Sequence, residues 1–175
     1  MARNIEIKAR IENAHQFKQR LHEITPQPAE IILQTDTFFN VAEGRLKLRD
    51  FRDGSAELIF YHRSNATEPT CSSYWRSSCE PDSMLELLTR AHGIRGVVKK
   101  RRELYLLEQT RIHFDEVDGL GTFCELEVVL EDQQTESAGQ SVARELMQSL
   151  MISDDDLVDG AYVDLLEHSA VTSRA

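Results

Sequence analysis

Alternation between polar and apolar positions is the most regular pattern in the chain. Residues 4–10, NIEIKAR, carry polar side chains at the even positions and apolar side chains at the odd positions. Because successive side chains of a β-strand point to opposite faces, this segment is predicted to be a strand with one polar and one apolar face. The polar face carries both signs of charge. This is typical of a solvated sheet face, or of a site that holds an anion and a metal ion together.

The same alternation recurs at 44–50, and the last three predicted strands are rich in β-branched and aromatic residues. Further strands are predicted at 31–41, 44–50, 56–63, 72–78, 97–107, 109–117 and 122–130. A turn at Asp53-Gly54 joins two of these strands into a hairpin, and DGLG at 118–121 joins the last two. The polar, proline-containing segment 64–73 is predicted to be a loop.

Helices are predicted where apolar residues recur at helical spacing. The predicted helices cover 12–24, 81–92 and 137–151, and a fourth starts at SDDD (153–156) and passes through Leu157, Ala161 and Leu165. Pro81 opens the second helix and Gly93 ends it. In this second helix, the residues expected to face the core are Met84, Leu85, Leu87, Leu88 and Ala91. Residues 1–167 are predicted to form a single domain, and residues 168–175 a loose tail.

Hairpins without regular βαβ alternation predict an antiparallel α+β fold, consistent with a closed barrel or a strongly curved sheet. At 175 residues the chain is long enough for a stable core. No apolar run reaches the roughly 18 residues that span a bilayer, and no secretory signal is visible. Three cysteines without a CxxC pair suit a reducing compartment. We therefore expect a cytoplasmic protein that does not associate with membranes.

Charge is distributed unevenly between the polar strand faces and the rest of the chain. The net charge of −10 argues against general nucleic-acid binding. The polar faces nevertheless collect nine basic residues, namely Lys8, Arg10, Arg45, Lys47, Arg49, Arg63, Lys100, Arg102 and Arg111. They also carry five acidic residues, namely Glu6, Glu57, Asp115, Glu125 and Glu127. If these faces line one cavity, an acidic protein encloses a basic interior that focuses its field on an anion.

A phosphate compound is the natural ligand for such an interior. Arginine suits forked recognition of phosphate oxygens, and lysine acts as a point charge, so a mixture around a closed sheet suits an extended polyphosphate. The carboxylates would repel phosphate unless a hard cation such as Mg²⁺ or Mn²⁺ lay between them.

Simpler interpretations stay open for each part of this pattern. A sheet with one solvated face also alternates in this way. Glu125 and Glu127 can form cross-strand salt bridges instead of binding a metal. In KKRR (99–102), a slip in strand parity would bring Lys99 and Arg101 to the site in place of Lys100 and Arg102. His113 fits a polar wall residue better than a general base.

Several motifs together resemble the CYTH domain of the triphosphate tunnel metalloenzymes, a family that includes class IV adenylyl cyclases and thiamine triphosphatases. These motifs are NIEIK (4–8), RLKLR (45–49), KRRELY (100–105), RIHFDEVDGLGTF (111–123) and ELE (125–127). The resemblance spans nearly the whole chain. It implies an antiparallel eight-stranded β-barrel, or tunnel, with helices packed outside.

The resemblance also implies roles for individual residues. The implied metal ligands are Glu6, Asp115, Glu125 and Glu127. The implied substrate-binding residues are Lys8, Arg10, Lys47, Arg49, Arg63, Lys100, Arg102 and Arg111. The implied catalytic residues are Glu6, Lys8, Arg102 and Glu127. Asn4 stands where the family motif ExExK has its first glutamate, which leaves open whether one metal ion binds or two.

These features predict an enzyme that depends on Mg²⁺ or Mn²⁺ and cleaves a phosphoanhydride bond of ATP, tripolyphosphate or thiamine triphosphate. Attack by water would make it a triphosphatase, whereas attack by a ribose 3′-hydroxyl would make cyclic AMP and pyrophosphate. A non-catalytic nucleotide or polyphosphate binder is the alternative, favoured by Asn4 and by the lack of an obvious general base. RNA binding is disfavoured by the net charge. The protein is expected to be a monomer or a homodimer.

Overall fold

The computed structural model describes residues 3–62 and 70–172 and contains a closed antiparallel barrel. Its strands are β1 (Arg3–Arg10), β2 (Glu30–Phe39), β3 (Arg45–Asp50), β4 (Ala56–His62), β5 (Thr70–Cys79), β6 (Ile94–Leu107), β7 (Thr110–Val117) and β8 (Gly121–Val129). Their order around the barrel is β1-β5-β4-β3-β2-β6-β7-β8, and β8 pairs again with β1. The predicted eight-stranded antiparallel α+β barrel is confirmed.

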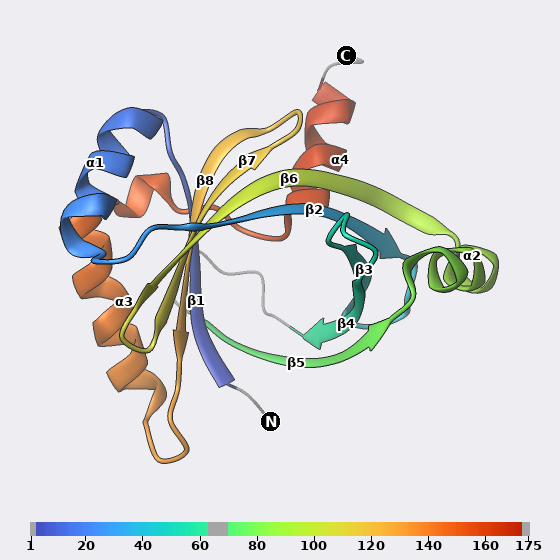
Figure 1. Cartoon of the computed structure of the whole chain (residues 1–175), viewed down its shortest axis with the longest axis horizontal. Coiled ribbons are helices and arrows are strands. Elements are labelled where there is room, and N and C mark those ends of the chain that lie inside the picture. Colours follow the sequence, from blue (N-terminus) through green and yellow to red (C-terminus); the bar gives the residue numbers. More distant parts are fainter. Residues whose placement is uncertain (1–2, 63–69, 173–175) are drawn as a thin grey trace.

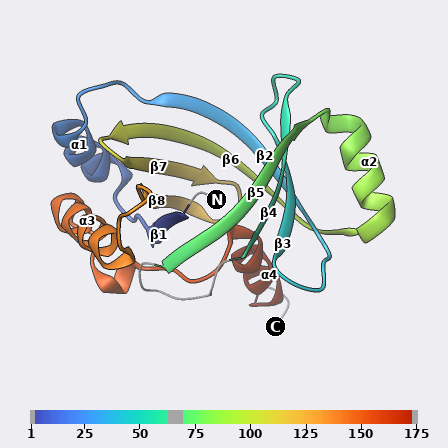
Figure 2. The same ribbon diagram turned by 90° about the horizontal axis from the view of Figure 1, so that it is seen from below.

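Helices lie outside the barrel. They are α1 (Ala14–Ile24), α2 (Pro81–His92), α3 (Glu136–Leu150) and α4 (Tyr162–Thr172), with a short 3₁₀ helix η1 (Asp154–Asp156) before α4. Figures 1 and 2 show α1 and α3 together at one end of the molecule and α2 at the other. Helix α3 packs on β1 and β8, α2 on β2 and β3, and α4 on β6. Within the described ranges, no helix has the length and apolar character needed to cross a bilayer.

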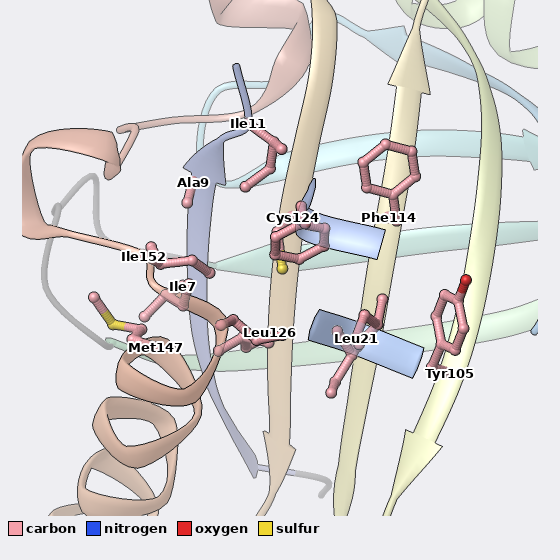
Figure 3. Close-up of a cluster of buried hydrophobic side chains, with 13 residues drawn as sticks. Ile7, Ala9, Ile11, Leu21, Tyr105, Phe114, Cys124, Leu126, Met147 and Ile152 are labelled. Atoms are coloured by element: carbon pink, nitrogen blue, oxygen red, sulfur yellow. The ribbon is translucent and has the colours of Figure 1, made fainter. Parts of the chain in front are cut away.

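The largest apolar cluster lies between the outer face of the barrel and helices α1 and α3. Figure 3 shows Ile7 of β1 and Leu126 of β8 beside Met147 of α3. Leu21 of α1 and Phe114 of β7 belong to the same cluster, and all five side chains are buried. Because the apolar face of these strands packs outward against helices, their polar face must point into the barrel. The apolar core outside the barrel therefore directs the polar side chains of these strands into the barrel interior.

Helix α2 begins and ends where the sequence predicts. The Glu80 carboxylate accepts hydrogen bonds from the first free amides of the helix, and Gly93 ends it with a φ of 72°. Two predicted core residues, Leu87 and Ala91, are wrong, because both are exposed. Leu87 is 60% exposed, because the buried stripe of the helix is centred on Leu88 and includes Met84 on the preceding turn.

The fourth predicted helix is wrong over its first half. Strand β5 pairs with β1 at residues 3–6, and the backbone of residues 157–158 lies along the next part of the β1 edge. There the Val158 amide donates to the Lys8 carbonyl at 2.9 Å. This extended segment separates η1 from α4, and Gly160 then turns the chain with a φ of 77°.

Two other boundaries differ from the predictions. Helix α4 continues to Thr172, past the predicted start of the loose tail at residue 168. Strand β5 begins at Thr70, inside the predicted loop 64–73. The rest of that loop, 64–69, lies outside the described residues.

Candidate functional site in the barrel interior

The barrel encloses a cavity of about 440 Å³, lined by side chains from all eight strands and by residues 160–162 at the start of α4. The predicted parity of the strands is confirmed. Lys100 and Arg102 line the cavity, whereas Arg101 points outward and pairs with Glu103 at 2.6 Å. The polar faces of distant strands therefore meet around one interior space.

Most of the residues predicted for the site line this cavity. They are Glu6, Lys8, Lys47, Arg49, Lys100, Arg102, Arg111, Glu125 and Glu127. Arg10 does not: it is exposed, lies 4.7 Å from the centre of the Phe123 ring and donates to the Leu120 carbonyl at 2.8 Å. Although it has the parity of Lys8, it lies at the end of β1, beyond the cavity. Arg63 lies outside the described residues.

Asp115 is fully buried behind the cavity wall. Arg102 donates from Nε to Oδ1 of Asp115 at 2.6 Å and from Nη2 to Oδ2 at 2.5 Å. The Tyr162 hydroxyl donates to the same Oδ2 at 3.0 Å. Burial raises the pKa of Asp115, but the charges of Arg102 and Lys100 outweigh it, and the net pKa is lowered. Both carboxylate oxygens are thus engaged within the protein, and metal binding by Asp115 stays a prediction.

Glu125 connects two cations of the site. Its Oε2 accepts from Arg102 Nη2 at 2.5 Å, and its Oε1 lies 3.4 Å from the Lys8 ammonium. Lys8 also donates to the Gly160 carbonyl at 2.8 Å. Burial raises the pKa of Glu125, but Arg102 and Lys8 hold it well below its usual value. Glu125 therefore forms the cross-strand salt bridges that the sequence left open as an alternative.

Glu127 and Glu6 face each other across the β8–β1 pair. Arg111 donates to Glu127 Oε2 at 3.1 Å, and the Asn4 amide nitrogen donates to Glu127 Oε1. Burial raises the pKa of Glu127, Arg111 lowers it, and the nearby charge of Glu6 raises it again; the net pKa is raised. The charge of Arg111 therefore does not fully offset the burial of the Glu127 carboxylate.

The Asn4 side-chain oxygen is buried without a hydrogen-bond partner, close to this pair of carboxylates. Two carboxylates and an amide oxygen are the oxygen ligands that Mg²⁺ and Mn²⁺ prefer. In the part of the chain that the structure describes, no three His, Cys, Asp or Glu residues form a metal-binding cluster. Glu6, Glu127 and the Asn4 oxygen are candidate donors for a divalent cation, and metal binding by them stays a prediction.

His113 lies between Glu125 and Glu127. Its Nδ1 is 3.8 Å from Glu125 Oε2, and its Nε2 is 4.0 Å from Glu127 Oε2. Burial, reinforced by the charge of Arg102, lowers the pKa of His113 to about 4. The imidazole is therefore neutral at pH 7 and does not offset the acidic charge.

The opposite wall is cationic and contains a residue that the sequence analysis missed. Asp36 of β2 is buried and bonds Lys47 at 2.8 Å and Arg49 at 2.9 Å, with Lys100 at 3.9 Å. Burial raises the pKa of Asp36, but Arg49, Lys47 and Lys100 hold it well below its usual value. Strand β2 carries one other charged residue, Glu30 at its start, and the inward positions on either side of Asp36 are Gln34 and Phe38, so no charge alternation indicated Asp36.

Tyr162 was also missed. Its ring centre lies 4.1 Å from the Lys8 ammonium and 5.1 Å from that of Lys100, so it contacts two cations of the site. Two residues further on, Asp164 bonds Arg45 at 2.8 Å and Arg95 at 2.6 Å. These contacts join α4 to the barrel interior. No local pattern could reveal them, since the partners are far apart in sequence.

The fold and the interior define a member of the CYTH domain family, whose model matches residues 2–162. A Methanocaldococcus jannaschii protein named "Putative adenylate cyclase" is 23% identical over 92% of this chain and 97% of its own. The PH1012 protein of Pyrococcus horikoshii has a similar structure, with a TM-score of 0.80 and 22% identity over 93% of this chain and 98% of its own.

A structure from Hippeastrum is also similar. Its TM-score is 0.62, with 18% identity over 85% of this chain and 88% of its own. That protein is described as a "putative adenylyl cyclase" with "a dominant triphosphatase activity".

Proposed function

We propose that the barrel interior binds the triphosphate of a small molecule together with a divalent cation, and that it cleaves one of the phosphoanhydride bonds. The observation that carries this proposal is the separation of charge across the cavity. Lys47, Arg49 and Lys100 share the carboxylate of Asp36 on one wall. Glu6 and Glu127 face each other on another.

The cationic excess calls for an anionic ligand. Among the described residues, eight Lys and Arg side chains line the cavity against five Asp and Glu. Buried cations that lack full compensation are costly, and a bound polyanion removes that cost. An extended triphosphate offers charge along the whole wall, which a single phosphate does not.

A divalent cation would be held by Glu6, Glu127 and the Asn4 oxygen. When bound, it supplies positive charge that neutralises the phosphoryl oxygens facing these carboxylates. Without such an ion, Glu6 and Glu127 would repel the ligand. Two carboxylates and one neutral amide suit a single ion, because Asn4 contributes no charge.

The side chains of the cationic wall act by position and charge. Lys47, Arg49 and Lys100 would hold the phosphates extended, and Arg102 and Lys8 would face the charge that develops on the transferred group. Phosphoryl transfer needs little more from the protein than this positioning. Attack by water yields a triphosphatase, and attack by a ribose 3′-hydroxyl yields a cyclase.

Product analysis tests the proposal. The protein is incubated with ATP, tripolyphosphate or thiamine triphosphate and Mg²⁺ or Mn²⁺, while phosphate, pyrophosphate and cyclic AMP are followed. Metal-dependent release of phosphate identifies a triphosphatase, and cyclic AMP with pyrophosphate identifies a cyclase. The Glu127→Gln variant is the control and is expected to lose metal-dependent turnover.

A non-catalytic binder is the second candidate, favoured by Asn4, which replaces a charged ligand and bonds Glu127. No turnover of any substrate, together with a tripolyphosphate-dependent rise in Tm, would support the binder. The absence of both turnover and a rise in Tm would contradict both candidate functions.

A further inference from the structure

Asp36 lies at the centre of the cationic wall. Arg49 donates to it from Nε at 2.9 Å and from Nη2 at 3.1 Å, and Lys47 donates to Oδ2 at 2.8 Å. The Lys100 ammonium lies 3.9 Å from the same Oδ2 and 3.6 Å from Asp115. One carboxylate of β2 thus fixes cations from the two strands that flank it, β3 and β6.

These contacts leave most donors of the three cations available to a ligand. Asp36 engages one edge of the Arg49 guanidinium, which has a further nitrogen, Nη1. Each lysine ammonium carries three donors. The Asp36 side chain is 3% exposed, against 12% for Lys47 and 16% for Arg49, so a ligand in the cavity meets these two cations before the carboxylate.

The charge of Asp36 also acts on Lys47. Burial and the neighbouring Arg49 lower the pKa of Lys47 to about 7, and Asp36 acts in the opposite direction. The other groups facing this ammonium are Lys100 of β6, whose charge contributes to the lowered pKa, and the rings of Phe38 and Tyr61 at 5.5 and 5.8 Å. Without Asp36, Lys47 would lose its proton at a lower pH.

We propose that Asp36 is a positioning residue of the anion site: it holds Lys47, Arg49 and Lys100 in the arrangement that receives phosphate oxygens. The inference rests on the proposed function and deepens it. A positioning role predicts that loss of the Asp36 charge weakens anion binding, which is the opposite of what the net charge of the site alone predicts. Removing a negative charge from an anion site would strengthen binding if Asp36 only competed with the ligand, whereas loss of a positioning residue weakens binding.

The test measures tripolyphosphate binding calorimetrically, without metal, between pH 6 and pH 8.5. Asp36→Asn is expected to bind about tenfold more weakly than the unmodified protein at pH 8 and to lose less at pH 6, where Lys47 regains its proton. Lys47→Arg added to Asp36→Asn is expected to recover much of the loss at pH 8, because arginine stays protonated. The titration of the ligand itself is common to all variants and cancels in the comparison.

Three results would overturn the inference or its basis. Equal or tighter binding by a folded Asp36→Asn variant would make Asp36 a structural residue or a competing anion. Failure of Lys47→Arg to recover affinity would contradict the role of Asp36 in holding the charge of Lys47. No binding by the unmodified protein would instead contradict the proposed function itself.

A second variant covers the case in which Asp36→Asn does not fold. Asp36→Glu keeps the charge but moves the carboxylate by one methylene. It is expected to bind tripolyphosphate several-fold more weakly, with the pH dependence of the unmodified protein. Unchanged affinity in this variant would contradict a positioning role.

Discussion

The guanidinium of Arg102 and the carboxylate of Asp115 form a doubly hydrogen-bonded pair with no solvent access to Asp115, which is 0% exposed. The two residues face each other across the β6–β7 pair. The carboxylate that the family resemblance assigned to a metal is therefore occupied by an arginine of the same site. This arrangement indicates that Asp115 orients Arg102.

Removal of the Asp115 charge is expected to destabilise the fold. Asp115→Asn leaves Arg102 buried with less compensation, and loss of one partner of a buried pair costs about 3 kcal/mol. Urea unfolding measures this free energy. Glu116→Gln, at an exposed position on the same strand, is the control and is expected to change it by less than about 0.5 kcal/mol. A stable Asp115→Asn protein that has lost Mn²⁺ binding would instead make Asp115 a metal ligand.

Loss of the Glu127 charge is expected to weaken metal binding. Because Glu127 and Glu6 supply the charged donors of the proposed site, Glu127→Gln should bind Mn²⁺ at least about tenfold more weakly. Electron paramagnetic resonance titration of free Mn²⁺ measures this without substrate. Glu57→Gln is the matched control, since Glu57 lines the same cavity but lies 3.7 Å from Arg76. Equal losses in both variants would argue against a localised metal site.

Glu103 is expected to contribute stability that disappears at low pH. It accepts hydrogen bonds from Lys18, Arg101 and Tyr105 on the outside of the barrel. Burial raises its pKa, but these partners lower it to about 2, below the usual 4.5. The folded state thus favours the charged form, so the stabilisation is present above pH 4.5 and is lost as the pH falls toward 2.

Glu103→Gln should therefore lower the free energy of unfolding by about 1–3 kcal/mol at pH 7. The difference from the unmodified protein should shrink between pH 4.5 and pH 2, as measured by urea unfolding at each pH. Tripolyphosphate affinity should not change, because Glu103 does not line the cavity. A difference that stays constant with pH would contradict the assigned pKa.

Gly139 allows α3 to lie close to the barrel. A Cβ at this position would clash with the Leu130 side chain and would lie 2.8 Å from that of Ile5. Gly139→Ala should therefore lower Tm and cost about 1–3 kcal/mol through overpacking. Ser141→Ala, at an exposed position on the same helix, is the control and should leave Tm nearly unchanged. A higher Tm for Gly139→Ala would show that Ile5 and Leu130 can move aside without cost.

Much of the fold could be predicted from sequence because each strand has one apolar face, and burial of that face against helices fixes the register. Helix boundaries followed from capping residues such as Pro81 and Gly93. The prediction for the fourth helix is wrong at its start because the acidic run 153–156 is typical of the first turn of an α-helix. Pairing of residues 157–158 with β1 then overrides the local preference, and only tertiary structure reveals that pairing.

The site was partly predictable for the same reason. The alternation of charged and apolar residues correctly predicted that Lys47, Lys100 and Glu125 face the interior. The partners of each charge could not be predicted, because strand order around the barrel decides which side chains meet. Asp36 lies on a strand with little charge, and Tyr162 comes from a helix at the far end of the sequence.

Structure determination with tripolyphosphate and Mn²⁺ tests the central claim most directly. The account predicts phosphate oxygens against Lys47, Arg49 and Lys100, and an anomalous Mn²⁺ peak beside Glu6 and Glu127. Phosphate bound only on the outer surface, with an empty barrel interior, would contradict it.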